Sequence, residues 1–429
     1  MSSAAALPGG EISVTIDASG WKSDAMQRRV AKRYASERRF RAIGMFAVAL
    51  SAGFLAFLLI KMLYDGLGGF TQTEIRLTVD FPSVAAGVTP KALEGKGADD
   101  ALAALDLESL AATSAAAAYG ETGSLLLSDG AWLSLRSALK SDPSLITRKA
   151  EIWVPASVNI DSAAKGAGEP DANRQLAALK AKGNVQTGFS TTFFTASDST
   201  DPTVVGIWGA FKGTLLTMAV TALLAFPVGM LAALYLEEYA PRNRWTDLIE
   251  VSINNLAAVP SIIFGLLGLA VFLNFMNMPR SAPIVGGLTL ALMTMPVIVI
   301  ASRNAIKAVP PSIRDAALAM GASPVQVVFH HVLPLAMPGI LTGTIIGMAR
   351  ALGETAPLIM IGMRAFISSP PTGLTEPATV LPVQIFLWSD EVSRGFVEKT
   401  SAAIIVLLAF LMTMNATAIY LRNHFERRW

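Results

Sequence analysis

The stretch SRNAIKAVPPSIRDAALAMGASPVQVVFHHVLP (residues 302–334) lies between two strongly apolar runs and decides how the rest of the chain is interpreted. Its pattern predicts two short helices joined at Gly321. Ser312 is positioned to cap the first helix, with Asp315 three residues later as the acidic half of a capping box. Ser323 is positioned to cap the second helix, with Pro324 in the first helical position. Pro334 is expected to stop it.

Each of these two helices is predicted to have an apolar face. The spacing i, i+3, i+4, i+7 is met in the first helix by Ile313, Ala316, Ala317 and Met320, and in the second by Val325, Val328, Phe329 and Val332. A pair of apolar-faced helices between two membrane spans indicates a surface that binds a partner.

The composition is that of a membrane protein. Of the 429 residues, 52% are hydrophobic and 15% are charged, and the mean hydropathy is +0.50. The sequence has no Cys, which excludes disulfides and thiolate metal sites. Its three histidines, His330, His331 and His424, are too few and too badly placed for a metal cluster, so we expect them to be solvated or interfacial.

The N-terminal part predicts a cytoplasmic basic tail, residues 1–41, followed by a membrane helix over 42–63. Residues 1–20 are small and polar and are expected to be disordered. Eight basic residues then precede an apolar run long enough to cross a hydrocarbon core of about 30 Å. The run is long, starts late and lacks a clear cleavage site, which favours a retained anchor over a signal peptide. The basic flank places the N-terminus in the cytoplasm.

Residues 64–206 form a hydrophilic insert with 17 acidic and 11 basic residues. Alternating patterns near 75–81 and 185–193 predict strands, and residues 99–118 and 171–182 have helical patterns. We therefore expect a small α+β extracytoplasmic domain between the first and second membrane helices. No motif in it indicates chemistry.

Five further apolar runs follow, at residues 215–236, 256–275, 284–301, 335–361 and 402–421. With the first, they predict an all-α polytopic membrane protein with six transmembrane helices and both termini in the cytoplasm. Short loops assigned to the inside are richer in Arg and Lys than the short outer loop near residue 278, as the positive-inside rule requires. Pro227, Pro260, Pro296 and Pro357 are expected to interrupt or kink spans, a pattern typical of transport proteins.

The fifth span has a stripe of small residues. Gly339, Gly343, Gly347 and Ala351 recur every four positions, so one side of the helix is nearly bare backbone. The pattern predicts close packing against another helix.

The same span has a charged pair, Arg350 and Glu354, expected on one face near mid-membrane. One charge there costs about 2.5–3.5 kcal/mol on insertion scales, so such residues line a polar pathway or pair with each other. Both interpretations stay open. For a pathway, Arg350 offers a forked donor to a tetrahedral anion, and ionised Glu354 accepts from a P–OH group that sulfate lacks. Pro357 is expected to bend the helix.

The sequence has no Gly-x4-Gly-Lys-Ser/Thr loop, which excludes an ATPase of the P-loop type. No Ser-His-Asp or Cys-His pattern indicates a catalytic nucleophile. We therefore expect a non-catalytic subunit without cofactor or metal, whose energy comes from a partner.

The segment 302–334 resembles the E-A-A…G…L-P cytoplasmic loop of ABC-importer permeases. The matching residues are Asp315-Ala316-Ala317, Gly321 and Leu333-Pro334. Asp315 stands where the family usually has Glu, and His331 where Ile is common. In that family the loop docks a short coupling helix on the ATPase subunit, so the resemblance implies a coupling role for Ile313, Asp315, Ala316, Ala317, Met320 and Gly321.

Residues 206–429 resemble, more narrowly, the PstA-type permeases of phosphate-specific importers. The resemblance rests on Gly213-Thr214-Leu215, the run YLEEYA at 235–240, the run NLAAVPSIIFG at 255–265 and ARALGETAP at 349–357. Ala356-Pro357 favours PstA over its sister permease.

This resemblance implies a type I ABC importer permease fold over residues 207–429 in a bacterial inner membrane. The implied partners are a second permease, two ATPase subunits, an extracytoplasmic phosphate-binding protein, phosphate and membrane lipid, but no nucleic acid. The implied substrate pathway contains Arg350, Glu354 and Thr355. The insert departs from the compact family pattern.

Two alternatives remain at this stage. The same architecture could pass sulfate, molybdate or a phosphonate. A different class is a membrane-anchored sensor or scaffold that acts through its outer domain and basic tail, although a sensor needs neither the charged fifth span nor the loop at 302–334.

Overall fold

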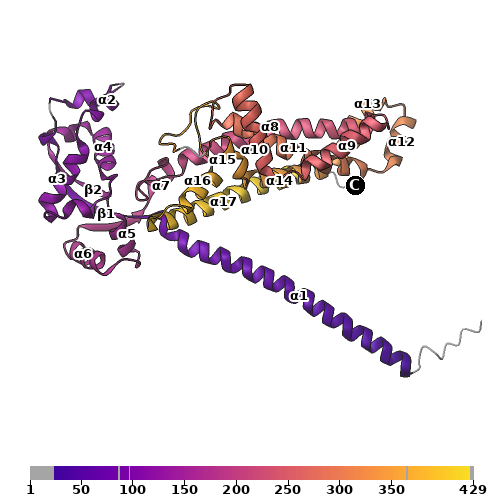
Figure 1. The fold of residues 1–429 in the computed structure, drawn as a ribbon, viewed down its shortest axis with the longest axis horizontal. Coiled ribbons are helices and arrows are strands. Elements are labelled where there is room, and N and C mark those ends of the chain that lie inside the picture. The colour runs from indigo at the N-terminus through magenta and orange to yellow at the C-terminus, as the bar shows by residue number, and fades with distance from the viewer. Residues whose placement is uncertain (1–23, 86, 96, 364–365, 426–429) are drawn as a thin grey trace, which may run out of the picture. The chain divides into compact units, whose positions relative to one another are not determined.

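The computed structural model describes residues 24–85, 87–95, 97–363 and 366–425, and the expected disorder of residues 1–20 lies outside them. The chain divides into two compact units, Met1–Lys61 and Met62–Trp429. The described residues of the first unit all belong to one helix, α1 (Asp24–Leu67). The basic flank and the first apolar run are therefore parts of one uninterrupted helix (Figure 1).

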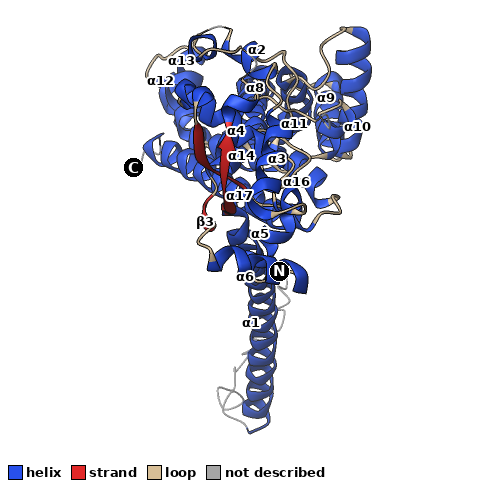
Figure 2. Ribbon diagram, turned by 90° about the vertical axis from the view of Figure 1, so that its left-hand side faces the viewer, coloured by secondary structure: helices blue, strands red, loops and turns tan. Residues whose placement is uncertain are grey.

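An inserted domain follows α1 and is built on a three-stranded antiparallel sheet (Figure 2). The strands are β1 (Thr71–Asp80), β2 (Lys149–Pro155) and β3 (Val185–Phe189), in the order β2-β1-β3. Ile75 in the central strand pairs with Val154 and with Val185. The expected α+β character of the insert is confirmed. The second predicted strand, expected to reach residue 193, ends earlier, because Phe193 lies in a short helix.

The core of the inserted domain forms because β1 alternates in polarity. Ile75, Leu77 and Val79 are fully buried on one face, and full burial of each such side chain contributes about 1.5–3 kcal/mol. Helices α3 and α4 pack on β1 and β2 to cover them. The helices of the domain are α2 (Ala98–Ala103), α3 (Leu107–Tyr119), α4 (Ala131–Ser141), α5 (Val158–Ala164), α6 (Pro170–Ala181) and α7 (Thr191–Thr195).

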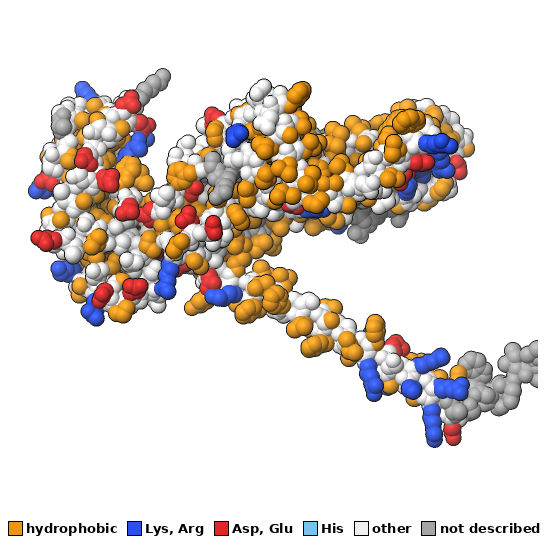
Figure 3. Space-filling model, viewed as in Figure 1, with side chains coloured by type: hydrophobic (Ala, Val, Ile, Leu, Met, Phe, Trp, Pro, Cys, Tyr) orange, Lys and Arg blue, Asp and Glu red, His pale blue; other side chains and the backbone are white. Residues whose placement is uncertain are grey.

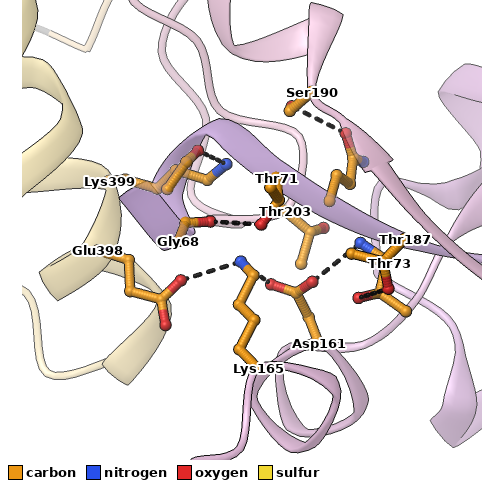
Figure 4. Close-up of polar contacts among 12 residues, drawn as sticks. Gly68, Thr71, Thr73, Asp161, Lys165, Thr187, Ser190, Thr203, Glu398 and Lys399 are labelled. Carbon is orange, nitrogen blue, oxygen red and sulfur yellow. Dashed lines mark hydrogen bonds and ion pairs between the residues drawn. The ribbon is translucent and has the colours of Figure 1, made fainter. Parts of the chain in front are cut away.

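Charged side chains join the inserted domain to the last long helix, α17 (Arg394–Phe425) (Figure 4). Lys165 Nζ donates to Asp161 Oδ2 at 2.7 Å and to Glu398 Oε2 at 2.9 Å. The side chains of Lys165 and Asp161 are 11% and 17% exposed. One ammonium group therefore links α5 to the first turns of α17.

Lys399 adds a second link at the same place. Its side chain is buried, donates from Nζ to the carbonyl of Gly69 at 2.9 Å, and lies 5.3 Å from the ring centre of Phe193. Gly69 needs to be glycine here, because an added Cβ would lie 2.5 Å from the carbonyl oxygen of Glu398. The short turn Gly68–Phe70 that follows α1, the inserted domain and α17 thus meet in one tightly packed junction.

The remaining helices form a bundle in which α11 packs against both α8 and α14 (Figure 1). The helices are α8 (Trp208–Leu234), α9 (Arg244–Ala257), α10 (Ser261–Gly268), α11 (Pro283–Lys307), α12 (Pro311–Ala319), α13 (Pro324–Gln326), α14 (Leu333–Leu352), α15 (Ala356–Met360) and α16 (Leu381–Ser389). Three π-helical segments interrupt or extend them: η7 (Tyr235–Tyr239), η8 (Leu269–Phe275) and η9 (Val327–Val332).

The glycine stripe of the fifth apolar run packs against α11, as its spacing predicted. A Cβ added to Gly343 would lie 2.1 Å from Cβ of Ala301, and one added to Gly339 would lie 2.6 Å from Cβ of Ala305. Such distances mean that the glycine backbone of α14 packs directly against alanine methyl groups of α11. The stripe is therefore a packing surface.

Within the described residues, five helices are long and apolar enough to cross a membrane. They are Met26–Phe70, Trp208–Tyr239, Pro283–Lys307, Pro324–Leu352 and Arg394–His424. A sixth span is reached only if Arg244–Ala257 and Ser261–Phe275, bent by 102°, count together. The apolar run expected over 256–275 is therefore interrupted near its start, and the expected count of six spans is not settled by helix length and composition. The break falls at Pro260, which lacks the N–H that a continuing helix needs.

Two of the four prolines expected to interrupt spans lie at helix breaks. Pro260 precedes α10, and Pro357 lies in the first turn of α15, after a break in the fifth apolar run at Gly353. Pro227 and Pro296 instead lie inside the continuous helices α8 and α11. Figure 3 shows hydrophobic side chains over much of the visible helix surface, whereas charged side chains gather at the end of the bundle near α12 and α13.

Candidate functional site

The segment 302–334 folds as two helical pieces on either side of Gly321, as expected. Gly321 has a φ of +87°, which favours glycine after a helix end. The predicted cap at Ser312 is wrong. Helix α12 has Pro310 at its N-cap and Pro311 in its first turn, so it begins before Ser312, whose side chain makes no cap bond. The fixed φ of proline favours this earlier start.

The cap of the second piece is confirmed. Gln326 N donates to Ser323 Oγ at 3.3 Å and Ser323 N donates to Gln326 Oε1 at 2.9 Å, which makes a complete capping box. The stop expected at Pro334 is wrong, because η9 continues into α14. In η9, Leu333 N donates to the carbonyl of Val328, five residues back, and the proline then lies in the first turn of α14.

The apolar face predicted for α12 is divided between two environments. Ala317 is 8% exposed and belongs to the apolar cluster at the ends of α8 and α11, with Ile313 packed at its edge. Met320 is 89% exposed, and Asp315 and Ala316 are exposed as well. One side of the helix therefore anchors it to the bundle, and the other side is free.

Exposed apolar side chains lie on both helical pieces. They are Leu318 of α12, its C-cap residue Met320, and Val325 and Phe329 beyond it. A cavity of about 650 Å³, lined mostly by apolar groups and including Ile313, opens beside α12. Exposed apolar side chains of this kind make the segment a candidate binding surface.

Ion pairs connect this segment to α8 and α9, and the sequence patterns did not identify them. Arg303 on α11 lies with Nε 2.5 Å from Glu237 Oε1 and Nη2 2.8 Å from Glu250 Oε2. Arg314 on α12 lies with Nη2 2.7 Å from Glu238 Oε1. A signal was present: two adjacent Glu residues end an apolar run, and the unmatched basic residues lie in the next loop on the expected cytoplasmic side.

The charged pair of the fifth apolar run lies where α14 ends. Arg350 is in the last turn, and Glu354 follows the C-cap residue Gly353, so the expectation that both lie on one helix face is wrong. Arg350 Nε still lies 3.5 Å from Glu354 Oε1, and their side chains are 50% and 20% exposed. Thr355 follows directly and precedes α15.

This arrangement can perform either role left open by the sequence. The pair is formed, but at 3.5 Å it is loose, and the half-exposed guanidinium keeps donors free for an anion. A cavity of about 10 Å³ touches Ala351 and Leu352 beside Thr217 of α8, which is space for about one water molecule. The hydroxyl of Thr217 is buried without a partner in the described structure.

Within the part of the chain that the structure describes, no group of three or more His, Asp or Glu side chains could hold a metal ion.

Two family models match the chain. The binding-protein-dependent transport system inner membrane component matches residues 225–429. A domain of unknown function, DUF3333, matches residues 27–174, which include most of α1 and much of the inserted domain.

Curated relatives match about half of the chain. The phosphate transport system permease protein PstA 1 of Mycobacterium tuberculosis is 32% identical over 224 residues, which cover 52% of this chain and 72% of the relative. The phosphate transport system permease protein PstA of Haemophilus influenzae is 29% identical over 52% of this chain and 77% of the relative. Among solved structures, an inward-facing MetNI methionine ABC transporter chain matches with a TM-score of 0.42 and 17% identity, over 52% of this chain and 98% of that chain.

Proposed function

Because the chain belongs to the family of PstA phosphate transport system permease proteins, we propose that it is the permease subunit of an ATP-driven importer of inorganic phosphate. The observation that carries this proposal is the 32% identity to a phosphate permease over 72% of that relative's length. The chain is a multi-pass inner membrane protein, and it supplies the pathway rather than the energy.

In the proposed topology, six spans leave both termini in the cytoplasm. The bent pair of α9 with α10 and η8 counts as one span, α1 supplies the first, and residues 64–206 lie outside. The basic flank of α1 and the basic residues near α12 support this orientation through the positive-inside rule. Residues 207–429 form the permease domain, and residues 1–41 a cytoplasmic tail.

In the proposed pathway, Arg350 binds the phosphate oxyanion and Glu354 accepts a hydrogen bond from its P–OH group, with Thr355 beside them. The loose 3.5 Å contact of the pair supports a site that opens for a solute. The exposure of Arg350 also supports a pathway completed by a second permease, since a half-exposed guanidinium at membrane depth needs a polar surface to cover it.

In the proposed coupling step, an ATPase subunit binds the exposed side of α12. Met320 and Leu318 supply apolar contact, and Ile313 and Ala317 keep the helix attached to the bundle. The complex then contains this chain, a second permease, two ATPase subunits and an extracytoplasmic phosphate-binding protein. Alternating access follows from displacement of the helices that α12 contacts.

Deletion of the chain in its own cells tests the proposal against the alternatives. In the deletion strain, we expect ATP-dependent uptake of radiolabelled phosphate to be lost and sulfate uptake to be unchanged. In a separate purification of the tagged chain from cells that express it, we expect two ATPase subunits and a second permease to co-purify. Loss of sulfate or molybdate uptake instead would identify another oxyanion. Normal phosphate uptake with a defect only in phosphate signalling would identify a sensor or scaffold.

A further inference from the structure

The cytoplasmic end of the bundle holds an ion-pair cluster that no pathway or docking role accounts for. We define it as the brace: Glu237 and Glu238 on η7, Arg303 on α11 and Arg314 on α12. Each of these four side chains is less than a quarter exposed. Charged side chains that are mostly buried destabilise a protein unless each is paired with an opposite charge.

Arg314 holds α12 to two other helices at once. Its guanidinium bonds to both carboxylate oxygens of Glu238, with the shortest contact at 2.7 Å. It also donates to the carbonyl of Val309 at 2.7 Å and to that of Ile306 at 3.1 Å. Ile306 lies in the last turn of α11 and Val309 just beyond it, where the helix dipole favours a cation.

Arg303 joins the helices to which Arg314 attaches α12. It pairs with Glu237 on η7 and with Glu250 on α9, so α8, α9 and α11 share one guanidinium. Glu237 and Glu238 are adjacent in the chain, and each receives a different arginine. The two pairs therefore act on the same short π-helical segment.

The backbone connections of α12 are short and do not fix its position relative to the bundle. Residues 308–310 join it to α11, and Gly321, with a φ of +87°, follows it. A displacement of α12 would change the conformation of these connections, and would not move α11, unless side-chain contacts hold the two helices together. Ala317 and Ile313 give apolar contact within a cluster that includes η9, and Arg314 gives the polar contacts to η7 and the end of α11.

We infer that Glu238 and Arg314, supported by Glu237 and Arg303, are positioning residues that make α12, α8 and α11 move as one body when an ATPase subunit displaces α12. This inference rests on the proposed function, because it requires an ATPase partner. It adds a link between the docking helix and two of the spans.

The first test measures phosphate moved per ATP hydrolysed by the complete complex in proteoliposomes. For Glu238→Gln we expect near-normal ATP hydrolysis and a fall of about fivefold or more in phosphate per ATP. The double variant Glu238→Gln/Arg314→Gln should fall no further than the single variants, because the two residues act together. Lys307→Gln is the control, since Lys307 is half exposed and lies 3.5 Å from Glu237; it should change nothing.

The second test does not depend on the solute. The natural chain has no Cys, so spin labels at Ser312→Cys on α12 and Leu231→Cys on α8 report one distance. We expect that distance to be the same with and without ATP in the otherwise natural chain, and to change or broaden with ATP in Glu238→Gln.

The brace is overturned if the label distance already changes with ATP when Glu238 is present, or if Glu238→Gln leaves it unaltered. The inference is also contradicted if the losses of phosphate per ATP in the two single variants add up in the double variant. It is contradicted as well if ATP hydrolysis and phosphate uptake fall together in Glu238→Gln. A complex that hydrolyses ATP and shows the expected distances but moves no phosphate would contradict the proposed solute and leave the brace supported.

Discussion

Lys165 of the inserted domain lies with Nζ 2.9 Å from Glu398 Oε2 at the start of α17. These residues are 233 positions apart in the sequence. Their contact means that the inserted domain is attached to the helix bundle at a defined place as well as through its two chain connections. Figure 4 shows Lys165 between Glu398 and Asp161.

Lys165→Met should therefore destabilise the protein. The change leaves two carboxylates facing each other, and we expect a loss of about 2–3 kcal/mol, below the loss for fully buried pairs because Glu398 is 27% exposed. Thermal unfolding of the purified protein measures it. Lys149→Met is the matched control, because Lys149 pairs with Asp80 at 2.8 Å on an exposed surface and should matter by less than about 1 kcal/mol. Equal losses in both variants would contradict the role of the junction.

Gly343→Ala should weaken the contact between α14 and α11. The new methyl group would lie 2.1 Å from Cβ of Ala301, and such overpacking costs about 1–3 kcal/mol. The double variant Gly343→Ala/Ala301→Gly should recover most of the lost thermal stability. Gly44→Ala, where the added Cβ meets nothing within 4 Å, is the control. Failure of the double variant to recover would mean that the helices do not meet at these residues.

Met320→Glu should weaken binding of the ATPase subunits and therefore reduce phosphate transport. Met320 is 89% exposed, so the substitution leaves the bundle intact, whereas bulk at the buried Ala317 would disturb packing first. Co-purification of the ATPase subunits measures the loss. Val392→Glu, at a 99% exposed valine, is the control and should leave assembly unchanged. A complete complex with Met320→Glu would place the docking surface elsewhere.

Glu354→Gln should reduce the preference for phosphate over sulfate. The amide can donate to a fully ionised oxyanion, whereas the carboxylate only accepts and so requires a protonated one. We expect phosphate uptake to fall and competition by sulfate to appear. Glu391→Gln, at an exposed glutamate, is the control and should do neither. If Glu354→Gln changes neither phosphate uptake nor selectivity, the ion pair between Arg350 and Glu354 has only a structural role.

Asp198 should make stability depend on pH. Burial raises the pKa of this carboxyl, although Trp388 Nε1 donates to it at 3.1 Å. A raised folded-state pKa means that its stabilising contribution is present below the unfolded pKa of about 3.9 and is lost as the pH rises through the folded value. Asp198→Asn should flatten this fall in thermal stability. Asp171→Asn, at an exposed carboxyl, is the control and should show the same fall in thermal stability with pH as the natural chain. If Asp198→Asn also shows that fall, Asp198 does not cause it.

The features predicted best from the sequence depend on neighbours along the chain. The capping box at Ser323 and the turn at Gly321 are set by local chemistry, and the alternation of Ile75, Leu77 and Val79 predicts the buried strand. The predicted cap at Ser312 failed because two adjacent prolines moved the helix start. The stop at Pro334 failed because a π-helical segment carries the helix across that position.

The features that sequence reasoning missed join distant parts of the chain. The brace pairs Arg314 with Glu238, 76 positions away, and the junction pairs Lys165 with Glu398. No local pattern assigns such partners, because periodicity reports only the neighbours of a residue on its own helix or strand. The stripe at Gly343 was found because small residues at four-residue spacing predict a contact without identifying its partner.

Phosphate accumulation is measured most directly in proteoliposomes that contain this chain, its co-purified permease and ATPase subunits, with the binding protein outside. We predict that radiolabelled phosphate accumulates only when ATP is inside, that sulfate does not accumulate, and that omission of this chain abolishes phosphate accumulation. Equal phosphate accumulation with and without the chain, or none in the complete ATP-hydrolysing complex, would show that the chain is not a phosphate permease.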